Sequence, residues 1–283
     1  MSNTALVSVI VPTRNSIRTI GACLSSVRSQ THPSLELIVV DKSSTDGTLE
    51  VAREYADVVQ PGGPERSAQR NLGARIAKGS YLFFVDSDMI LQPTVVFDSL
   101  NVMKASGAPA VIIPEESIGE GFWAKCRILE RSCYEGDDLV EAARFFRREI
   151  FESHAGFDEQ LTGPEDWDLS LRVARGSPLP RAHSQIFHDE GRIRLGSALA
   201  KKFYYARSFR VYIRKHGTVA LRQANIIVRP AFLRRWRRLL RHPLLSAGIF
   251  VLKGLEFGAA LAGAASGTPR SLPPPSGSLE KLS

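Results

Sequence analysis

Short runs of consecutive apolar residues, each closed by polar residues or proline, punctuate the first part of the chain. Five such runs have the length of β-strands rather than of helices, and they occupy residues 7–11, 35–40, 58–59, 81–85 and 110–113. Apart from Ser8 and Glu36, these runs are apolar at every position, which suits strands buried on both faces, as in a parallel sheet covered by helices. The pattern therefore predicts a sheet with two covered faces.

Helical periodicity fills the spaces between these strands. Asn15 or Ser16 is placed to cap a helix that continues to about residue 29, and further helices are predicted at 48–55 and at about 67–77. Strands that alternate with helices of this length indicate β-α-β units with right-handed crossovers. We therefore expect an α/β fold with a mainly parallel sheet flanked by helices.

Polar residues follow three of these strands directly. They are Pro12-Thr13-Arg14-Asn15 after the first strand, Asp41-Lys42 after the second and Asp86-Ser87-Asp88 after the fourth. The carboxyl ends of parallel strands share one edge of a sheet, where ligands bind in such folds, so we expect these residues to line one site. Two carboxylates at the end of a buried strand favour a hard cation, Mg²⁺ or Mn²⁺, and hence a phosphate-bearing substrate. The alternative is an ordinary polar turn, in which Asp and Ser are common.

Several segments match one known family in their order and spacing. They are Val7–Asn15, Ile38–Asp41 with Ser44–Thr48, Arg70–Gly73, Gly79–Asp88, Gly156–Glu159 and Glu165–Leu169. Over roughly residues 7–190 the chain resembles the family 2 glycosyltransferases. The resemblance implies a GT-A (Rossmann-like) fold, a nucleotide-diphosphate sugar as donor, a divalent cation, a hydroxyl acceptor and transfer with inversion at the anomeric carbon.

The resemblance also assigns the residues that handle the diphosphate. Asp88 would bind Mg²⁺ or Mn²⁺, and Asp86 would reach the ribose, the metal or its water shell. His188 is a candidate third metal ligand, although a lone histidine is often structural. Arg192 and Arg194 lie in a glycine-flanked loop that could clamp the diphosphate; a solvated basic loop is the alternative reading.

By the same resemblance, the nucleotide pocket consists of Pro12, Thr13, Asn15, Asp41 and Arg70. Asp41 can accept a hydrogen bond from the ring N–H of uracil, which favours a UDP-sugar, and its alternative role is that of a turn residue. Asp46 is expected to cap the following helix at Thr48 instead of contacting a ligand. Lys42 departs from the commonest family pattern, which leaves the donor's identity open.

Asp166 is the candidate catalytic base. It lies in Glu165-Asp166-Trp167-Asp168, at the start of a helix predicted over 165–175. By resemblance, the second acidic residue of this motif takes the proton of the acceptor hydroxyl. Carboxylates also favour the first turn of a helix because they complement its dipole, so a capping role is the alternative.

Composition divides the chain into an acidic body and a basic C-terminal third. The 283 residues carry a net charge of +8, yet 15 Lys and Arg and no Asp or Glu lie between Arg192 and Arg241. Such asymmetry indicates a nucleic acid, an anionic membrane or a phosphorylated ligand as partner. The three cysteines lack metal-ligand spacing, and no secretory signal is evident at the N-terminus, so we expect reduced thiols in the cytoplasm.

The C-terminal third predicts three segments. Residues 1–190 are expected to form the catalytic domain, 191–265 a basic and amphipathic helical region with one helix over 197–215, and 266–283 a disordered tail. No nucleic-acid motif accompanies the basic residues. The mostly apolar stretch 243–265 contains Lys253 and Glu256; it could lie in a membrane interface, pack on the body, form a dimer interface or cross a membrane.

A membrane-edge location favours a lipid-linked or cell-envelope acceptor, with residues 229–265 in contact with the inner face of the cell membrane. Three other functions remain open. The first is a glycosyltransferase for a soluble small molecule. The second is a sugar-nucleotide pyrophosphorylase, against which the absence of glycine from Val9 to Asn15 argues. The third is a non-catalytic adaptor on a degenerate transferase fold, which the intact acidic motifs disfavour.

Overall fold

The computed structural model describes residues 4–224 and 230–266, and these form two compact units. The first unit contains the residues up to 116 together with 141–159 and 165–189; the second contains 117–140, 160–164 and the residues from 190 onward. The single division predicted at residue 190 is therefore too simple, because residues 117–140 and 160–164 also join the second unit. Of the predicted tail, 266–283, only Ser266 lies within the described residues.

A six-stranded sheet in the order β3-β2-β1-β4-β8-β6 forms the centre of the first unit. Its strands are β1 (Val7–Thr13), β2 (Leu35–Asp41), β3 (Val58–Pro61), β4 (Tyr81–Phe84), β6 (Ala110–Ile112) and β8 (Ala143–Arg147). β1 pairs in parallel with β2 and β4, and β2 with β3, whereas β8 is antiparallel to β4 and β6. The predicted α/β class with a mainly parallel sheet is confirmed.

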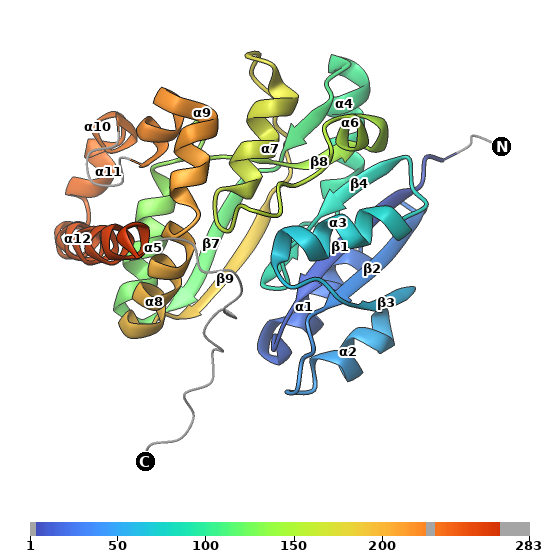
Figure 1. The fold of residues 1–283 in the computed structure, drawn as a ribbon, viewed down its shortest axis with the longest axis horizontal. Helices are drawn as coiled ribbons and strands as arrows, with labels where there is room; N and C mark the ends of the chain where they lie inside the picture. Colours follow the sequence, from blue (N-terminus) through green and yellow to red (C-terminus); the bar gives the residue numbers. More distant parts are fainter. Residues whose placement is uncertain (1–3, 225–229, 267–283) are drawn as a thin grey trace. The chain divides into compact units, whose positions relative to one another are not determined.

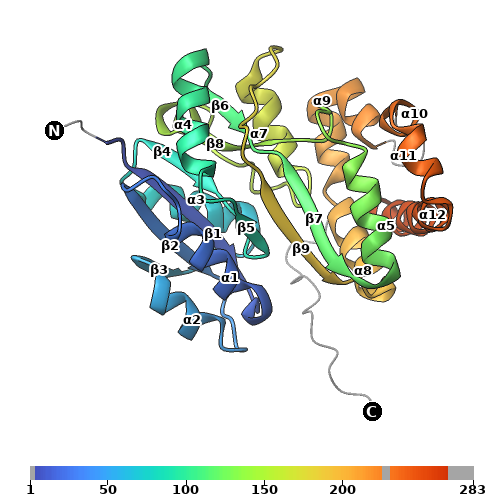
Figure 2. The ribbon, with the colours of Figure 1, turned by 180° about the vertical axis from the view of Figure 1, so that it is seen from behind.

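Helices cover both faces of this sheet. On one face lie α1 (Ile17–Arg28), α2 (Thr48–Tyr55) and α4 (Val95–Ser106), and on the other lie α3 (Arg66–Ile76), α6 (Arg148–Ser153) and α7 (Glu165–Ala174). Figure 1 views the sheet from the side of α3 and α7, and Figure 2 from the side of α1 and α4. Within β1, Val9 and Val11 enter the core with α1 whereas Ile10 enters the core with α3. Burial on both faces explains why the strand is apolar at successive positions.

The register of the parallel strands brings three polar strand ends to one edge. Thr13 lies opposite Asp41, and Ile10 lies opposite Phe84, so the residues that follow β4 are level with the end of β1. The convergence predicted from the sequence is therefore confirmed. A second sheet, β5-β9-β7, consists of β5 (Met89–Leu91), β9 (Ile186–Arg192) and β7 (Glu115–Glu120).

Two local predictions near α1 were wrong. β1 does not stop at Pro12 but continues to Thr13, because parallel pairing with β2 extends to this point. The side chains of Asn15 and Ser16 do not cap α1; instead, Asp46 Oδ2 accepts a hydrogen bond from the Ile17 amide at 3.1 Å. Asp46 Oδ1 also accepts from the Thr48 amide at 3.1 Å, which confirms its predicted capping role before α2.

Gly73 allows α3 to approach the sheet closely. A Cβ atom at this position would lie 2.4 Å from Cγ2 of Ile10 and 3.3 Å from Cγ2 of Val40. We expect Gly73→Ala to lower the free energy of unfolding by about 1–3 kcal/mol through overpacking, as measured by urea denaturation. Gly21→Ala in α1 is the matched control: its Cβ would meet Val51 Cγ1 at an ordinary 3.7 Å, so a neutral or slightly stabilising effect is expected. Equal stabilities of the two variants would contradict the prediction.

Helices make up most of the second unit. They are α5 (Gly121–Ser132), α8 (Leu195–Ala206), α9 (Phe209–Ala224), α10 (Pro230–Arg234), α11 (Trp236–Leu240) and α12 (Pro243–Ala265). The single helix predicted over 197–215 was wrong, since the chain breaks between α8 and α9. At the break, Ser208 Oγ accepts a hydrogen bond from the Thr162 amide at 3.0 Å and donates one to the Thr162 carbonyl at 2.9 Å. These two hydrogen bonds attach the segment between α8 and α9 to Thr162.

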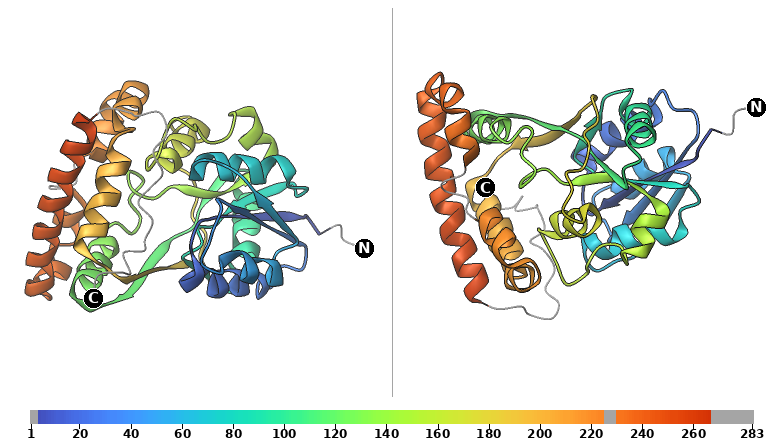
Figure 3. Two further views of the ribbon diagram at one scale, coloured as in Figure 1. Left: turned by 60° about the horizontal axis from the view of Figure 1, so that its bottom comes forward. Right: turned by 90° about the horizontal axis from the view of Figure 1, so that it is seen from above.

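The apolar stretch 243–265 is one helix, α12, which packs against α5 and α8 within the second unit (Figure 3). Cys126 and Leu129 of α5 share a small core with Phe232 of α10 and Ile249 of α12. In the part of the chain that the structure describes, α12 is the one helix whose length and composition would suffice to cross a membrane. A third of its most apolar window is buried against the protein.

Candidate functional site

One group of charged side chains in the first unit gathers at the edge where β1, β2 and β4 end. It is assembled from the segment between β4 and β5 and from α3, α7, β8 and β9. It contains Arg66, Arg70, Asp86, Asp88, Arg144, Glu165, Asp166 and His188. Five of these eight residues were predicted from the sequence as site residues. The structure therefore brings the Asp86-Ser87-Asp88 strand end and the Asp166 helix end into one site.

Arg70 is the residue that joins the two acidic segments. Its side chain is fully buried on α3, and its Nη2 lies 2.6 Å from Asp86 Oδ1 while its Nη1 lies 2.6 Å from Asp166 Oδ1. The guanidinium carbon lies 5.1 Å from the centroid of the Phe157 ring, which supports it from one side. The planar fork of arginine presents its donors in fixed directions to the two carboxylates, whereas the ammonium group of lysine is a compact point charge without this fork. The sequence predicted that Arg70 lies near the nucleobase or the phosphates of the donor. In the structure, Arg70 contacts the carboxylates of Asp86 and Asp166.

Asp86 is held by a second guanidinium group as well. Arg144 of β8 places its Nη1 3.4 Å from Asp86 Oδ2, and its Nε donates to Glu115 Oε1 at 2.6 Å. Burial would raise the pKa of Asp86, but the charges of Arg70 and Arg144 outweigh it and hold this pKa well below the ordinary value. Asp86 is thus a carboxylate that faces two arginines, whose charges favour its ionised form.

Glu165 is structural in character, although it precedes the candidate base. Its side chain is 1% exposed and accepts a hydrogen bond from Arg66 Nε at 2.8 Å. Burial acts to raise the pKa of Glu165, yet the guanidinium groups of Arg66 and Arg70 lower it below the usual range. Arg66 and Arg70 lie four residues apart on α3, so both reach α7 from one helix face.

Asp166 combines a partly exposed side chain with a raised pKa. Its side chain is 20% exposed, and it stands in the first turn of α7. Burial raises the pKa of Asp166 above its ordinary value; Arg70 opposes this rise and the Glu165 carboxylate adds to it. A raised pKa makes a carboxylate a better proton acceptor near neutral pH. Asp166 Oδ1 accepts a hydrogen bond from Arg70 Nη1, and the place of Asp166 in the first turn of α7 also suits the helix dipole, so its role as the base stays a prediction.

Asp88 and His188 form the candidate metal-binding pair. The backbone brings them together because the Asp189 amide donates to the Asp88 carbonyl at 2.8 Å and Met89 lies opposite His188 in the β5–β9 register. His188 Nε2 lies 3.2 Å from Asp88 Oδ2, and its Nδ1 lies 3.5 Å from Glu115 Oε2. A metal-bound histidine commonly has a carboxylate at its other ring nitrogen, which is the position that Glu115 occupies here.

This pair fits Mg²⁺ or Mn²⁺ as part of a ligand set that the substrate completes. Among the described residues, no group of three His, Cys, Asp or Glu side chains is arranged to hold a metal ion. Mg²⁺ sites in nucleotide enzymes commonly use one or two carboxylates together with phosphate oxygens. Asp88 and His188 would hold the ion here, while Asp86 faces Arg70 and Arg144.

The predicted nucleotide residues lie at the ends of β1 and β2. Thr13 is buried, and its Oγ1 makes no hydrogen bond with described residues. Asp41 accepts hydrogen bonds from the amide and hydroxyl groups of Ser44, and Asn15, with a φ of 49°, accepts from the Thr45 amide at 2.9 Å. Pro12 is buried within β1. These bonds order the loop from 42 to 47, and the nucleotide-binding role of the four residues stays a prediction.

Arg192 and Arg194 belong to the second unit, at the end of β9 and just before α8. Their role as a diphosphate clamp stays a prediction. The sequence interpretation missed Arg66 and Arg144 of the charged group and gave Glu165 no role in the site. It also missed Glu115, which contacts Arg144 and His188. Arg144 carried a signal, since it is a charged residue within the otherwise apolar strand 143–146, and a buried charge requires a partner. Arg66 was recognisable by its spacing of four residues from Arg70.

Comparison with protein families gives one match over slightly more than half of the chain. The family model described as "Glycosyl transferase family 2" matches residues 8–154. The chain is 31% identical over 149 residues to the poly(ribitol-phosphate) beta-N-acetylglucosaminyltransferase TarP of Staphylococcus aureus, which covers 50% of this chain and 46% of that protein. It is 33% identical over 109 residues to the uncharacterized glycosyltransferase YibD of Escherichia coli, covering 36% of this chain and 31% of YibD. The chain thus spans less than half the length of these two relatives.

Other matches extend over nearly the whole chain. A PGL/p-HBAD biosynthesis glycosyltransferase of Mycobacterium tuberculosis is 25% identical over 255 residues, which is 82% of this chain and 97% of the relative. The structure of S. aureus TarS 1–349 in complex with UDP-GlcNAc aligns with a TM-score of 0.56 at 17% identity, over 92% of this chain and 91% of that one. A mannosyltransferase of Pyrobaculum calidifontis in complex with GDP-Man and Mn²⁺ aligns with a TM-score of 0.53 at 20% identity, over 94% of this chain and 75% of that one. At these identities, the two structures establish likeness of fold.

Proposed function

The chain belongs to glycosyl transferase family 2, and we propose that it transfers a sugar from a nucleotide-diphosphate donor to an acceptor hydroxyl group with inversion at the anomeric carbon. The family and the GT-A fold predicted from the sequence are confirmed. The observation that carries the proposal is the contact of Arg70 with both Asp86 and Asp166. It unites the strand end predicted to face the diphosphate with the residue predicted to act on the acceptor.

The proposed reaction is a single displacement. The acceptor oxygen forms a bond to the anomeric carbon while the bond from that carbon to the donor diphosphate breaks. Asp166 takes the acceptor proton, and the nucleoside diphosphate departs. A bound Mg²⁺ or Mn²⁺, held by Asp88 and His188, would supply positive charge at the departing diphosphate. Asp86 orders the site through Arg70 and Arg144, and its predicted contact with the ribose is compatible with its 14% exposed side chain.

The proposed donor is a UDP-sugar. Asp41 at the end of β2 can accept from a uracil ring N–H, and the buried Thr13 Oγ1 offers a polar atom that lacks a partner among the described residues. A structure of the same fold binds UDP-GlcNAc, which supports this choice, whereas another binds GDP-Man. The donor base and sugar therefore need a direct binding measurement.

The proposed acceptor is a cell-envelope or lipid-linked glycan. Two relatives act, by their names, on poly(ribitol-phosphate) and in PGL/p-HBAD biosynthesis, which supports an envelope acceptor here. Such an acceptor would bring the protein to the inner face of the cell membrane, where residues 229–265 are the candidate contact. Transfer to a water-soluble small molecule, with no transfer to a lipid-linked glycan, would contradict this part of the proposal.

Binding of the donor is expected to depend on the metal and on Asp88. We expect UDP-sugars with Mn²⁺ to raise the melting temperature of the protein, and EDTA to abolish the rise. At a ligand concentration of 100 times Kd, the stabilisation amounts to about 2.7 kcal/mol. Asp88→Asn should remove most of it because one anionic ligand of the metal is lost.

Glu54→Gln on the exposed side of α2 is the charge-matched control and should leave the shift unchanged. A panel of UDP-, GDP- and dTDP-sugars then identifies the donor base. A shift of equal size in EDTA, or in Asp88→Asn, would remove the metal from the proposal. No shift with any nucleotide sugar would overturn the proposed donor class.

A further inference from the structure

Helix α12 is inverted with respect to an ordinary surface helix, which buries its apolar face and exposes its charges. Its two charged residues, Lys253 and Glu256, are 4% and 1% exposed. Six of its large apolar residues point outward instead, although Ile249 and Leu252 are buried: Leu244, Phe250, Val251, Leu255, Phe257 and Leu261 are between 37% and 79% exposed. We refer to these six residues as the outer face of α12. Every exposed position from 243 to 265 is apolar or glycine.

The inward charges fix the rotation of α12 about its axis. Lys253 Nζ lies 2.5 Å from Glu130 Oε1 of α5 and 2.8 Å from Glu256 Oε2. Arg127 of α5 pairs with Glu256 and, at 3.2 Å, with Glu130, so two cations face two anions. Removal of any one of these partners would leave a buried charge uncompensated, which is strongly unfavourable. The side of α12 that carries Lys253 and Glu256 therefore packs against the rest of the protein.

Two glycines reinforce the same orientation. A Cβ at Gly248 would lie 2.5 Å from Cys126 Sγ of α5, and a Cβ at Gly263 would lie 2.1 Å from the Phe203 carbonyl oxygen of α8. Only glycine permits this close approach of α12 to both helices. One side of α12 thus packs closely against α5 and α8, and the outer face points away from these two helices.

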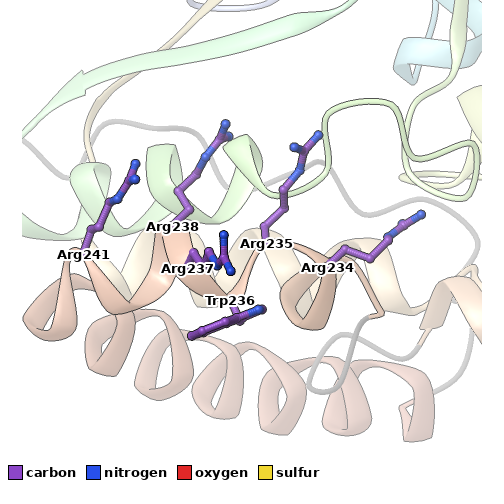
Figure 4. A pocket seen from close by; sticks show the side chains of 6 residues that line it. All are labelled: Arg234, Arg235, Trp236, Arg237, Arg238 and Arg241. Atoms are coloured by element: carbon purple, nitrogen blue, oxygen red, sulfur yellow. The ribbon is translucent and has the colours of Figure 1, made fainter.

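A basic cluster adjoins the start of α12. Arg234, Arg235, Trp236, Arg237, Arg238 and Arg241 line a pocket of about 390 Å³ on α10 and α11 (Figure 4). Some of these arginines have structural partners: Arg234 pairs with Asp137 at 2.7 Å, and Arg238 donates to the Ser132 carbonyl at the end of α5. Arg237 stacks on the 52% exposed Trp236, and neither Arg237 nor Arg241 makes a side-chain hydrogen bond or ion pair with the described residues. These two cations are available to an external anion.

We propose that the outer face of α12 inserts into an anionic lipid bilayer, with the helix in the plane of the membrane and with Arg237 and Arg241 against the lipid headgroups. Charge complementarity favours an anionic bilayer over a second copy of the chain as the partner of the outer face. A bilayer with anionic lipids offers an apolar layer and a negative surface side by side, and tryptophan favours the boundary between them. A second copy of the chain would instead bring its own arginine cluster, because no acidic residue lies between Arg192 and Arg241 to compensate it.

The same contacts decide against a crossing of the bilayer. A helix that crosses exposes its whole circumference to lipid or to other apolar helices, whereas α12 keeps Lys253 and Glu256 paired with α5. Attachment therefore depends on one face of α12, and it is independent of the transferase activity.

The experiment is sedimentation of the full chain with vesicles of phosphatidylcholine, with and without phosphatidylglycerol. We expect binding that is strongest with phosphatidylglycerol. Val251→Gln with Leu255→Gln should lower the partition coefficient at least tenfold at low and high salt, since burial of apolar area is not screened. Arg237→Gln with Arg241→Gln should lower it about fivefold per arginine on anionic vesicles at low salt, and little at high salt.

Matched controls separate these effects from general changes in surface character. Phe97→Gln with Leu221→Gln removes two apolar side chains that are 51% and 55% exposed elsewhere, and Arg53→Gln with Arg75→Gln removes two exposed arginines; both controls should bind as the unchanged protein does. Circular dichroism and melting temperature check that each variant is folded. Equal binding of Val251→Gln/Leu255→Gln and of its control would overturn the proposal.

Two further outcomes point to other occupants. A dimer in light scattering that Val251→Gln/Leu255→Gln dissociates would make a second copy the occupant of the outer face. Resistance of the membrane-bound protein to extraction at alkaline pH would show that α12 crosses the bilayer. Either result would overturn attachment in the plane of an anionic membrane, and neither bears on the donor or on Asp166.

Discussion

Replacement of Asp166 by asparagine is expected to lower kcat for sugar transfer by about 10²–10⁴-fold, the range that a positioned general base typically contributes. Asparagine keeps the shape of the side chain but has no proton-accepting carboxylate. Binding of the donor should change little, because Asp166 faces the acceptor in the proposed reaction. Initial rates with saturating donor, together with the donor's Kd from calorimetry, measure the two effects separately.

Glu149→Gln is the matched control for the alternative that Asp166 only stabilises its helix. Glu149 is an exposed carboxylate in the first turn of α6, so its replacement removes the same favourable interaction with a helix dipole. It should leave kcat unchanged. Full activity of Asp166→Asn would exclude Asp166 as the base.

The dependence of kcat on pH gives the same residue a second test. The pKa of Asp166 is raised by burial, so the carboxylate gains its proton at a higher pH than an ordinary aspartate does. As pH falls through this raised pKa the base is lost, and the acid limb of the profile should therefore lie above the ordinary range of aspartate. Asp166→Asn should lose this limb from its residual activity.

The sheet and its polar edge could be predicted from the sequence because their signals are local. Buried parallel strands require apolar residues at consecutive positions, and the positions of Thr13, Asp41 and Asp86 relative to the strand ends follow from the chain itself. The parallel register then makes their convergence a geometric necessity. The same holds for Asp46, whose side chain acts within two residues at Thr48.

The partners of the charged residues could not be predicted, because they come from distant parts of the chain. The sequence assigned Asp88 to the metal and Asp86 to the ribose, the metal or its water shell, but it did not indicate which protein side chains surround each of them. Asp86 faces Arg70 and Arg144, whereas Asp88 faces His188. Arg70 is 16 residues from Asp86 in sequence but 96 residues from Asp166. No periodic pattern in a sequence indicates a contact between residues so far apart.

The orientation of α12 about its axis could not be predicted from the sequence either. In the sequence, Lys253 and Glu256 interrupt an apolar stretch and weaken the case for a helix that crosses the membrane. In the structure, they pair with Arg127 and Glu130 of α5, and the exposed surface of the helix becomes uninterrupted apolar area. Hydropathy alone averages over the circumference of a helix, so it cannot distinguish charges that face the protein from charges that face outward.

Arg70→Gln is expected to have the largest effect on stability, about 3–5 kcal/mol lost from the free energy of unfolding, the range for the removal of one partner from a buried ion pair. Arg70 is fully buried and contacts Asp86 and Asp166 at 2.6 Å each, with Glu165 at 3.6 Å. Without its guanidinium group, Asp86 and Asp166 lose their shared cation. Urea denaturation at neutral pH measures the loss.

The pH dependence of this variant distinguishes lost charge from lost packing. The Arg70 cation lowers the pKa of Asp86 and of Asp166, so its removal lets both carboxyl groups take up a proton at higher pH. Protonation relieves the uncompensated charge, and the deficit of Arg70→Gln relative to the unchanged protein should therefore shrink as pH falls. A deficit that stays constant with pH would indicate lost packing on Phe157 instead.

Two further variants complete the argument. Arg75→Gln changes an exposed arginine on the same helix and should alter stability by no more than about 0.5 kcal/mol. Arg70→Lys keeps the charge but loses the planar fork that presents separate donors to Asp86 and Asp166, so its stability should fall between those of Arg70→Gln and the unchanged protein. Because the bridge also sets the position of Asp166, Arg70→Lys should lose kcat even where it remains folded. If Arg70→Lys kept both full stability and full kcat, a single positive charge would suffice, and the two acidic segments of the site would not depend on a shared guanidinium group.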